Sequence, residues 1–557
     1  MVRSFLAVVG REVRGMHEAA YMLAAFALGS QLLALVRDRL LAAHFGASST
    51  LDVYYAAFRI PDFLFATVAS LLSLYALLPV LSRLGQEHAG LVVSFLRQIL
   101  FVFFVGMGLI SAVAFVMAPW LVAWVAPGLA NPDLILLVRI LLLQPLLLGA
   151  SNIVASWTQL RHRFFLYSVS PLLYNLGIIF GIVALYPHVG LAGLGWGVVL
   201  GASLHLLVQL PFFTSGKVTK TLPLGLLYKE LVAVLGLSIP RTLALAAGQI
   251  SLLAMVALAS YFSVGSIAVF MFAYNLQAVP LTIIGVSYSV AAFPTLARLH
   301  ARGERAEFVR YVETALRHIF FWSIPATVFC VVLRAQLVRV ILGVGAFSWD
   351  ATRLVAAALA LFIISLAAQS ITLLIARAYY AAGNTKKPLY FGCVDVVVSV
   401  CSALALVALF HWSSFMRAFI EAILRVTDVP GTIVLMLALG LSLGSIVKFV
   451  VGFVFFIHDF KIPRVRLGDL IFQSFAASVL GGGVAYLVLF YTGLAGSVNT
   501  ALGLVLQGGV AGILGVTTTG LVLALLKNQE LAEALAALRR RFKDTPPMAL
   551  EPTDISS

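Results

Sequence analysis

Long apolar runs, each near the length of a membrane-crossing helix, constrain this chain more than any other feature. A bilayer core about 30 Å thick requires about 20 consecutive apolar residues of helix. Cutting the 557 residues at their polar connections gives fourteen such runs, joined by connections too short to hold a soluble domain. The sequence therefore predicts an all-α integral membrane protein with about 14 transmembrane helices. The runs lie near residues 20–44, 52–82, 91–117, 134–160, 166–186, 189–213, 229–258, 265–296, 308–333, 352–381, 388–410, 431–457, 467–491 and 499–526.

The overall composition agrees with a chain that faces lipid. Hydrophobic residues make up 62% of it and charged residues only 11%, whereas soluble domains spend about 25% of their residues on charge. No short apolar signal core with a small-residue cleavage site precedes the first run, so we expect that run to remain as a span.

The formal net charge of +15 is interpreted as a topology signal. Basic residues gather in the N-terminal segment, the even-numbered connections and the C-terminal tail, for example at Arg302, Arg305 and Arg539–Arg541. Lys and Arg concentrate at the cytoplasmic ends of membrane spans. Both termini are therefore predicted to be cytoplasmic, and nucleic acid is not expected as a partner.

The three cysteines give no sign of a disulfide or a metal site. Cys330, Cys393 and Cys401 each lie inside an apolar run, without CxxC or Cys/His spacing. We expect no metal and no cofactor.

A weak internal repeat divides the chain into two similar halves. Pro79-Val-Leu-Ser-Arg-Leu at the end of the second run is echoed by Pro294-Thr-Leu-Ala-Arg-Leu at the end of the eighth. Ala150-Ser151-Asn152 in the fourth run is likewise echoed by Ala368-Gln369-Ser370 in the tenth. Six spans separate the members of each pair, so both copies keep the same orientation. They would be two six-helix lobes related by an axis along the membrane normal.

Duplicated lobes of this kind place a substrate cavity between them and work by rocking. The alternative to an internal repeat is that Pro-x-Leu-x-Arg-Leu is simply a common sequence at the end of a span. The predicted division has a cytoplasmic N-terminal segment at 1–19, an N-lobe of spans 1–6 at 20–213, a C-lobe of spans 7–12 at 214–457, a C-terminal helix pair of spans 13 and 14 at 458–526, and a cytoplasmic tail at 527–557.

Ionisable residues inside the apolar runs are the first candidates for a functional site. A central Arg or Asp costs at least about 2.5–3.5 kcal/mol in hydrocarbon and faces a cavity or a partner. Arg37 and Asp38 lie in the outer half of the first run and are followed by Asp52. A cluster that snorkels to the interface is an equal alternative for them. Arg59 lies about 10 Å into the second run beside Pro61, which frees a backbone carbonyl, and is expected to face the cavity.

Arg241 is the strongest single signal, because it lies near the middle of the seventh run with no acidic residue close by in sequence. Its partner is either an anionic ligand or a carboxylate on another span, and Asp395 in the eleventh run is the obvious candidate. A purely structural Arg–Asp pair is the alternative. Asn275 adds a neutral polar group that lines the cavity or bonds across helices.

No catalytic constellation accompanies these residues. A Walker loop for ATP is absent, and the first outer connection is too short for a membrane glycosyltransferase. The longest outer connection, residues 411–430, has the spacing of an amphipathic helix on the outer interface. We therefore expect no enzymatic activity and no catalytic residues.

The stretch from Ser30 to Pro61, with Arg37-Asp38, Phe45-Gly46-Ala47, Asp52 and Ala57-Phe58-Arg59-Ile60-Pro61, resembles the opening of the MurJ/MviN family of lipid II flippases. This family belongs to the multidrug/oligosaccharidyl-lipid/polysaccharide exporter superfamily. Ala126-Pro127-Gly128 and Ala382-Gly383-Asn384-Thr385-Lys386-Lys387-Pro388 extend the likeness, which covers essentially the whole chain.

The resemblance implies a central cationic cavity for a pyrophosphate and sugar-peptide head group, with a groove for the polyprenyl tail at the last two helices. By motif position, Arg37, Asp38 and Asp52 match functional positions of the family. Departures occur at Gln31, at Asp62-Phe63 and at Tyr274-Asn275 and Ala278, where family cations or carboxylates are missing. Arg59 and Arg241 would then supply positive charge from other positions, and the head group could be a related lipid-linked oligosaccharide.

The resemblance implies a flippase of the bacterial plasma (inner) membrane that moves a polyprenyl-pyrophosphate-linked peptidoglycan precursor outward by alternating access. The expected substrate-binding residues are Arg37, Asp38, Asp52, Arg59, Arg241 and Asn275, with Asp395 as an ion or charge-pair site. Expected partners are this lipid and the bilayer, with a monomeric chain that meets cell-wall synthesis proteins. The alternatives are a cation-coupled multidrug or polysaccharide-lipid exporter of the same superfamily, and a scaffold that transports nothing.

Overall fold

The computed structural model describes residues 16–72, 89–129, 131–161, 163–214, 223–461, 467–495 and 501–543, together with 77, 80, 81 and 84. The regular elements of these residues are all helices, which confirms the all-α prediction. Among the described residues, ten helices are long and apolar enough to cross a membrane, or eleven if a pair bent by 47° counts as one span. The total of fourteen spans is compatible with this result and stays a prediction.

The first six predicted spans correspond to a set of partly broken helices. Their elements are α2 (Met16–Phe45), α3 (Ser49–Ala57), α4 (Arg59–Thr67), η1 (Ala69–Leu72), α6 (Ala89–Val125), η2 (Pro127–Leu129), α7 (Pro132–Leu141), α8 (Leu143–Leu160), α9 (Phe164–Phe180), η3 (Gly181–Leu185), α10 (Tyr186–Val189), α11 (Leu191–Leu207) and α12 (Leu210–Thr214).

The next six predicted spans run from α13 to α22. Their elements are α13 (Leu224–Ala259), α14 (Ser266–Leu281), η4 (Thr282–Val286), α15 (Ser287–Ala301), α16 (Arg305–Val332), α17 (Arg334–Leu342), α18 (Trp349–Ile363), α19 (Leu366–Ala381), α20 (Lys386–Trp412), α21 (Ser414–Leu424) and α22 (Val434–Phe460). Helix α21 confirms the amphipathic helix predicted for the outer connection. The chain ends with α23 (Gly468–Ala495), α24 (Ala501–Leu525) and α25 (Gln529–Lys543).

Two predicted spans are broken near prolines. The second changes at Phe58 from α3 to α4, and Pro61 lies in the first turn of α4. The fourth changes at Leu142 from α7 to α8, and Pro145 lies in the first turn of α8. Proline is tolerated there because a backbone N–H in the first turn has no intrahelical acceptor. The break between α3 and α4 sets the direction in which Arg59 leaves the helix.

Glycines allow the closest helix contact in the first half of the chain. A Cβ on Gly177 would lie 2.3 Å from the Cα of Gly201, and a Cβ on Gly181 would lie 2.5 Å from the Cα of Gly197. Helices α9 and α11 therefore pack backbone to backbone, as small residues permit in membranes. Helix α2 packs on α9 as well, which places Arg37 beside the α9 residues.

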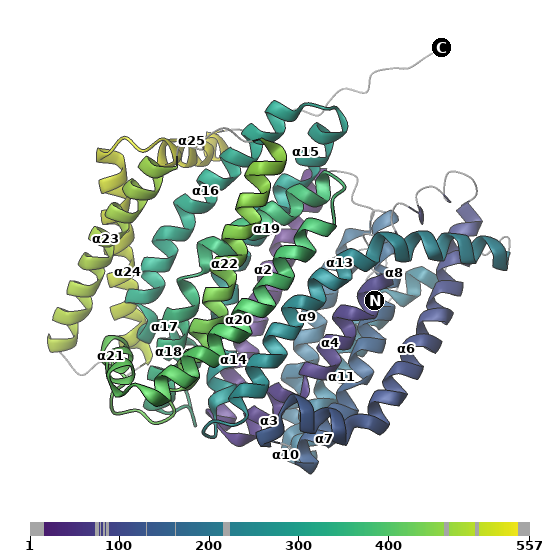
Figure 1. The fold of residues 1–557 in the computed structure, drawn as a ribbon, viewed down its shortest axis with the longest axis horizontal. Coiled ribbons are helices and arrows are strands. Elements are labelled where there is room, and N and C mark those ends of the chain that lie inside the picture. The colour runs from purple at the N-terminus through teal and green to yellow at the C-terminus, as the bar shows by residue number, and fades with distance from the viewer. Residues whose placement is uncertain are drawn as a thin grey trace.

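Figure 1 shows α6 at one edge of the molecule and α23 with α24 at the other, with α13 and α20 between them. Helix α13 packs against α20 and also against α4, η1 and α6. It is thus one of the elements through which the two predicted lobes meet, beside the contacts of α14 with α3 and of α17 with α2. The exact lobe boundaries stay predictions.

Candidate functional site

An arginine and an aspartate of α2 meet neutral amide side chains of α9 and α14 where the two predicted lobes face each other. Arg37 donates to the Asp38 carboxylate from Nε at 2.9 Å and pairs with it through Nη2 at 2.8 Å. Its Nη1 also donates to Oδ1 of Asn175 in α9 at 3.3 Å. Asp38 is 3% exposed and accepts a hydrogen bond from Asn275 in α14 at 3.1 Å. Three residues proposed from the sequence are therefore brought together, and Asp38 connects α2 of the predicted N-lobe to α14 of the predicted C-lobe.

Arg59, which is buried, forms a second ion pair with the partly exposed Asp62. Its Nε donates to the Tyr55 carbonyl at 3.3 Å, and its Nη2 lies 3.4 Å from Oδ2 of Asp62, one helical turn along α4. Asp62 also accepts from Gln144 in α8 at 3.4 Å. The remaining nitrogen of Arg59, Nη1, is buried and has no partner in the described structure. Sequence reasoning treated Asp62 only as a departure from the family and missed its role as the counter-ion of Arg59.

Tyrosines surround these pairs. Tyr54 and Tyr55 are both buried, and the Tyr55 hydroxyl has no hydrogen-bond partner among the described atoms. Tyr274 in α14 lies with Asp395 in the lining of one cavity. The described part of the site thus combines two arginines, two carboxylates and several hydroxyls, and its formal charges balance.

Arg241 lies in the part of α13 that packs on the predicted N-lobe. Thr242, the next residue, makes a 3.0 Å hydrogen bond through its hydroxyl to Ser70 in η1. Helix α13 therefore meets the N-lobe at the level of Arg241. The side chain of Arg241 lies outside the described part of the structure.

Asp395 is paired with a residue that the sequence analysis overlooked. Its Oδ2 lies 3.0 Å from Nζ of Lys448 in α22, and its Oδ1 accepts from Ser399 at 3.3 Å. The pairing with Arg241 was our sequence-based expectation, and the partner that the structure gives is Lys448. A lysine within the apolar run 431–457 was the signal that could have found it. The pair lines a cavity of about 190 Å³ together with Tyr274, Gln369 and Ser445.

Asp52 lies away from this cluster, at a seam between the predicted lobes on the side predicted to face outward, which is called the outer seam below. Its carboxylate accepts from the backbone N–H groups of Gly265 at 2.6 Å and Ala268 at 2.8 Å, the start of α14. Both oxygens are occupied by helix-terminal donors, which an anionic cap satisfies. Its assignment as a substrate-binding residue stays a prediction.

Backbone contacts close the same outer seam. The N–H of Ala346 donates to the Ala43 carbonyl at 2.9 Å. Gly345 has φ +62°, and a Cβ there would lie 2.3 Å from the Ala43 oxygen. Arg39 donates to the carbonyl of Val340 and, at 3.4 Å, to that of Ile341. In this structure the two predicted lobes touch directly at the face predicted to be the outer one.

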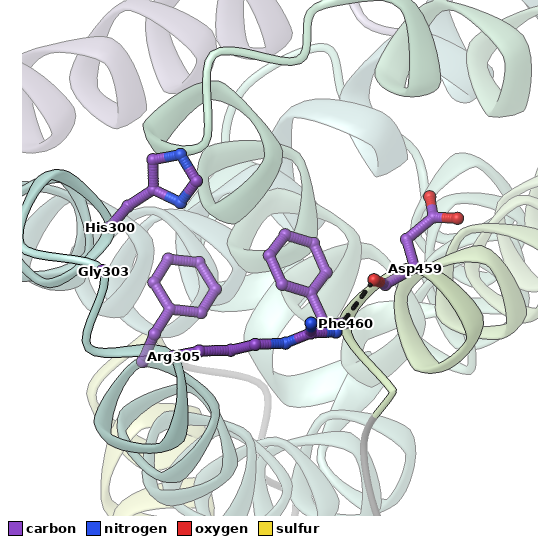
Figure 2. Close-up of a pocket in the computed structure, with 6 residues that line it drawn as sticks. His300, Gly303, Arg305, Asp459 and Phe460 are labelled. Carbon is purple, nitrogen blue, oxygen red and sulfur yellow. Dashed lines mark hydrogen bonds between the residues drawn. The ribbon is translucent and has the colours of Figure 1, made fainter.

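A second cavity, of about 290 Å³, opens between α15, α16 and the end of α22 (Figure 2). Arg305 donates to the Asp459 carbonyl at 3.2 Å, and the Phe308 and Phe460 rings stack 5.1 Å apart. The Asp459 carboxylate points away from Arg305 and pairs with Lys387 at 3.0 Å. The cavity holds no nucleophile–base pair. Within the described ranges, moreover, no group of three His, Cys, Asp or Glu residues could hold a metal ion.

A family model and two relatives that are similar to this chain agree with one another. The model of the family described as lipid II flippase MurJ matches residues 41–506. The lipid II flippase MurJ of Burkholderia cenocepacia is 26% identical over 392 residues, which cover 68% of this chain and 75% of that protein. The probable lipid II flippase MurJ of Thermotoga maritima is 27% identical over 526 residues, covering 92% and 97%.

Solved structures show the same fold. The lipid II flippase MurJ in an inward closed conformation superposes with a TM-score of 0.70 at 18% identity, covering 91% of this chain and all of that one. A multidrug resistance transporter of the MATE family and MOP superfamily, in an inward-facing conformation, gives a TM-score of 0.63 at 14% identity, covering 78% of this chain and 94% of that one.

Proposed function

Because the chain belongs to the lipid II flippase MurJ family, we propose that it moves a polyprenyl-pyrophosphate-linked peptidoglycan precursor from the inner to the outer leaflet by alternating access. A polyanionic head group cannot enter hydrocarbon unaided, whereas its polyprenyl tail can stay in lipid. The protein then has to supply a polar passage for the head group alone. It is a multi-pass membrane transporter.

The observation that carries this proposal is the charged cluster at the interface of the lobes. Arg37, Asp38 and Asn275 connect α2 to α14, and Arg59 lies buried in α4. Charged groups are found inside an apolar chain where they line a polar passage or pair with one another. Arg37, Asp38, Arg59, Arg241 and Asn275 form the proposed head-group site.

The arginines would exchange one set of anions for another during transport. In this structure Asp38 and Asp62 neutralise Arg37 and Arg59. A pyrophosphate offers each guanidinium a bidentate acceptor of higher charge. The buried Nη1 of Arg59, which has no partner among the described atoms, is a donor already available for it. Asp52 would act by holding the outer seam shut while the head group is loaded from the inner side.

The proposal also covers the Asp395–Lys448 pair, the oligomeric state, the location and the partners of the protein. Asp395 and Lys448 form a charge pair inside the C-lobe that stabilises it during rocking. The protein works as a monomer in the bacterial inner membrane, with both termini in the cytoplasm, and passes its lipid to cell-wall synthesis proteins. It catalyses no covalent reaction and binds no nucleic acid.

One observation favours the second candidate, a cation-coupled exporter of the same superfamily. The formal charges of the described cluster balance. Unless Arg241 also faces the passage, the passage is therefore less cationic than a carrier of pyrophosphate requires. A small amphipathic compound with a cationic group would find acceptors at Asp38 and Asp62.

Mass spectrometry of lipids that copurify with the protein distinguishes the two candidates. A polyprenyl pyrophosphate carrying a sugar-peptide head group is expected. Transport is then measured as outward movement of labelled lipid II in cells depleted of their own flippase, with expression checked by immunoblot. Resistance to cationic drugs, with no such lipid bound and no rescue of the depleted cells, would replace the proposal with the second candidate.

A further inference from the structure

An ion pair of the predicted C-lobe borders a cavity that the proposed head-group site does not use. The cavity, of about 190 Å³, lies among α13, α14, α19, α20 and α22. Figure 1 shows α13, α20 and α22 side by side in the middle of the molecule. Asp395 of α20 and Lys448 of α22 both line the cavity, and their charged atoms lie 3.0 Å apart. Because both charges border open space, a ligand in the cavity can reach them.

Several polar groups of this cavity have hydrogen-bonding capacity left over. Among the described residues, Asp395 is the one acceptor for the Lys448 ammonium, which has three N–H groups. The hydroxyls of Tyr274 and Ser445 have no hydrogen-bond partner within the same ranges. The amide nitrogen of Gln369 donates to the hydroxyl one turn earlier in the chain at 2.7 Å, and its Oε1 accepts nothing there. Unpaired polar groups inside a membrane protein are unfavourable, so a polar occupant would stabilise the cavity.

The charges of the pair cancel, which limits the kind of occupant. A cation beside Asp395 would also lie beside the Lys448 ammonium, and an anion beside Lys448 would also lie beside the Asp395 carboxylate. Since these two groups are 3.0 Å apart, an ion of either sign is repelled about as strongly as it is attracted. An occupant with an ammonium and a carboxylate close together avoids this repulsion, because each of its charges meets the opposite one.

The volume and the apolar wall of the cavity limit the size of the occupant. At about 30 Å³ for each water, the 190 Å³ correspond to about six waters. This is room for the end of one amino-acid side chain and too little for a sugar-peptide head group as a whole. Leu252, Leu281 and Leu441 form part of the wall, which suits the methylene carbons of such a side chain.

The cavity adjoins the proposed head-group site. Tyr274 lines the cavity, and the next residue, Asn275, donates to Asp38 of the head-group cluster. Helix α13, which also lines the cavity, packs on α4, the helix that carries Arg59. A substrate whose phosphates lie at Arg37 and Arg59 therefore has the cavity beside it for another part of its head group.

We propose that this cavity binds an α-amino-acid end of the head-group peptide, that is, a carbon that carries both an ammonium and a carboxylate. The inference rests on the proposed function for the presence of a peptide, and it adds the chemical class of one side chain. The carboxylate accepts from Lys448, Ser445 and Tyr274, and the ammonium donates to Asp395 and Gln369. While the cavity is empty, Asp395 and Lys448 neutralise each other. The pair is then a determinant of substrate specificity as well as of stability.

Two forms of lipid II that differ in one peptide residue test this selection. Diaminopimelate ends in a carbon with both charges, whereas lysine ends in an ammonium alone. The purified full chain in detergent is titrated with each form and examined by native mass spectrometry. We expect the wild type to bind the diaminopimelate form about tenfold more tightly, since it adds charge-assisted hydrogen bonds that the lysine form lacks. Asp395→Asn/Lys448→Met, which leaves no unpaired charge, should bind both forms equally.

A second variant fills the cavity and leaves the ion pair in place. Gly248 of α13 lines the cavity, and an added Cβ there has no atom within 4 Å. Gly248→Leu should therefore remove the preference without lowering the melting temperature. Gly236→Leu is the matched control, because Gly236 lies on the same helix and also has no atom within 4 Å of an added Cβ. It should keep the tenfold ratio.

The ratio of the two affinities separates this inference from the proposed function. Equal binding of both forms to the wild type overturns the cavity assignment and leaves lipid II transport standing. A preference that persists in Asp395→Asn/Lys448→Met overturns the assignment as well. Binding of neither form contradicts the proposed function and this inference with it. Arg37→Ala/Arg59→Ala should weaken both forms alike and keep their ratio, since the arginines contact the shared pyrophosphate.

Discussion

Each arginine of the described cluster, Arg37 and Arg59, lies beside a carboxylate of its own chain. Arg37 has Asp38 and Arg59 has Asp62, at 2.8 and 3.4 Å. A lone buried charge costs several kcal/mol, so an empty passage in lipid needs such internal counter-ions. The Arg59–Asp62 contact is the longer of the two, and Nη1 of Arg59 has no partner among the described atoms. Arg59 is therefore more readily available to a phosphate group than Arg37.

Replacing the arginines tests whether they grip phosphate. Arg59→Lys and Arg241→Lys keep the charge but lose the planar guanidinium group with its paired donors, so each should slow outward movement of labelled lipid II. Arg59→Ala and Arg241→Ala should slow it by at least about tenfold. Arg302→Ala, on an exposed arginine of the connection after α15, is the matched control. Wild-type rates for both alanine variants would show that these arginines are structural.

The Asp395–Lys448 pair predicts strong coupling in a double-mutant cycle. Asp395→Asn or Lys448→Met alone leaves a charge in an apolar lobe, which should lower the free energy of unfolding by about 1–3 kcal/mol after allowance for the partly exposed lysine. The double variant should be nearly as stable as the wild type. Unfolding in mixed detergent micelles measures this, with Cys393→Ala on the same helix as control. Strict additivity would leave Asp395 as an independent proton or cation site.

At the scale of elements, the start of α14 is where the two predicted lobes are in contact at the outer seam. Asp52 of α3 receives two backbone N–H groups there, and Gly265, just before the helix, has φ +89°. A Cβ on Gly265 would lie 2.4 Å from the Ala47 carbonyl oxygen. The N-terminal cap of α14 is supplied by a residue of the opposite predicted lobe. The cap therefore forms only while the two lobes are in contact at this seam.

Asp52→Asn should weaken the outer closure, because an amide lacks the charge that favours the helix N-terminus. The expected loss is about 1 kcal/mol, or roughly fivefold in the closed-to-open ratio. Labelling of Ala47→Cys by an impermeant maleimide in whole cells reports it, in a background with the three native cysteines replaced. Unchanged labelling would mean that the cap does not control the seam.

Gly345→Ala should open the seam more strongly, because a Cβ there meets the Ala43 oxygen at 2.3 Å. Gly190→Ala is the matched control, since Gly190 also has positive φ, +64°, but no atom within 4 Å of the added Cβ. The control carries the same backbone strain without the contact. Equal labelling of the Ala47→Cys reporter in both variants would assign the effect to strain and remove the contact argument.

For the whole molecule, the same seam has to part once in every transport cycle. The backbone bond between Ala43 and Ala346 makes this pair a natural place to lock it. Alternating access requires two global states, and a link that permits only one of them stops transport.

Cross-linking Ala43→Cys to Ala346→Cys should therefore abolish outward movement of labelled lipid II, and reduction should restore it. Each single cysteine variant, treated with the same oxidant, serves as control. Transport at the normal rate by a fully cross-linked protein would exclude opening at this seam and with it the proposed mechanism.

The sequence by itself determined the solvent in which the chain folds, its helical class and its family. Apolar runs of about 20 residues permit only helices whose backbone bonds are internal, so these conclusions follow from local composition. The motif around Arg37, Asp52 and Arg59 gave the family for the same reason, since it is contiguous in the chain. The tertiary structure decided which charges meet. Asp395 lies 53 residues from Lys448, and Asp52 lies 213 residues from Gly265. Spacing in the chain carries no information about such pairs, because helix packing alone brings them within bonding distance.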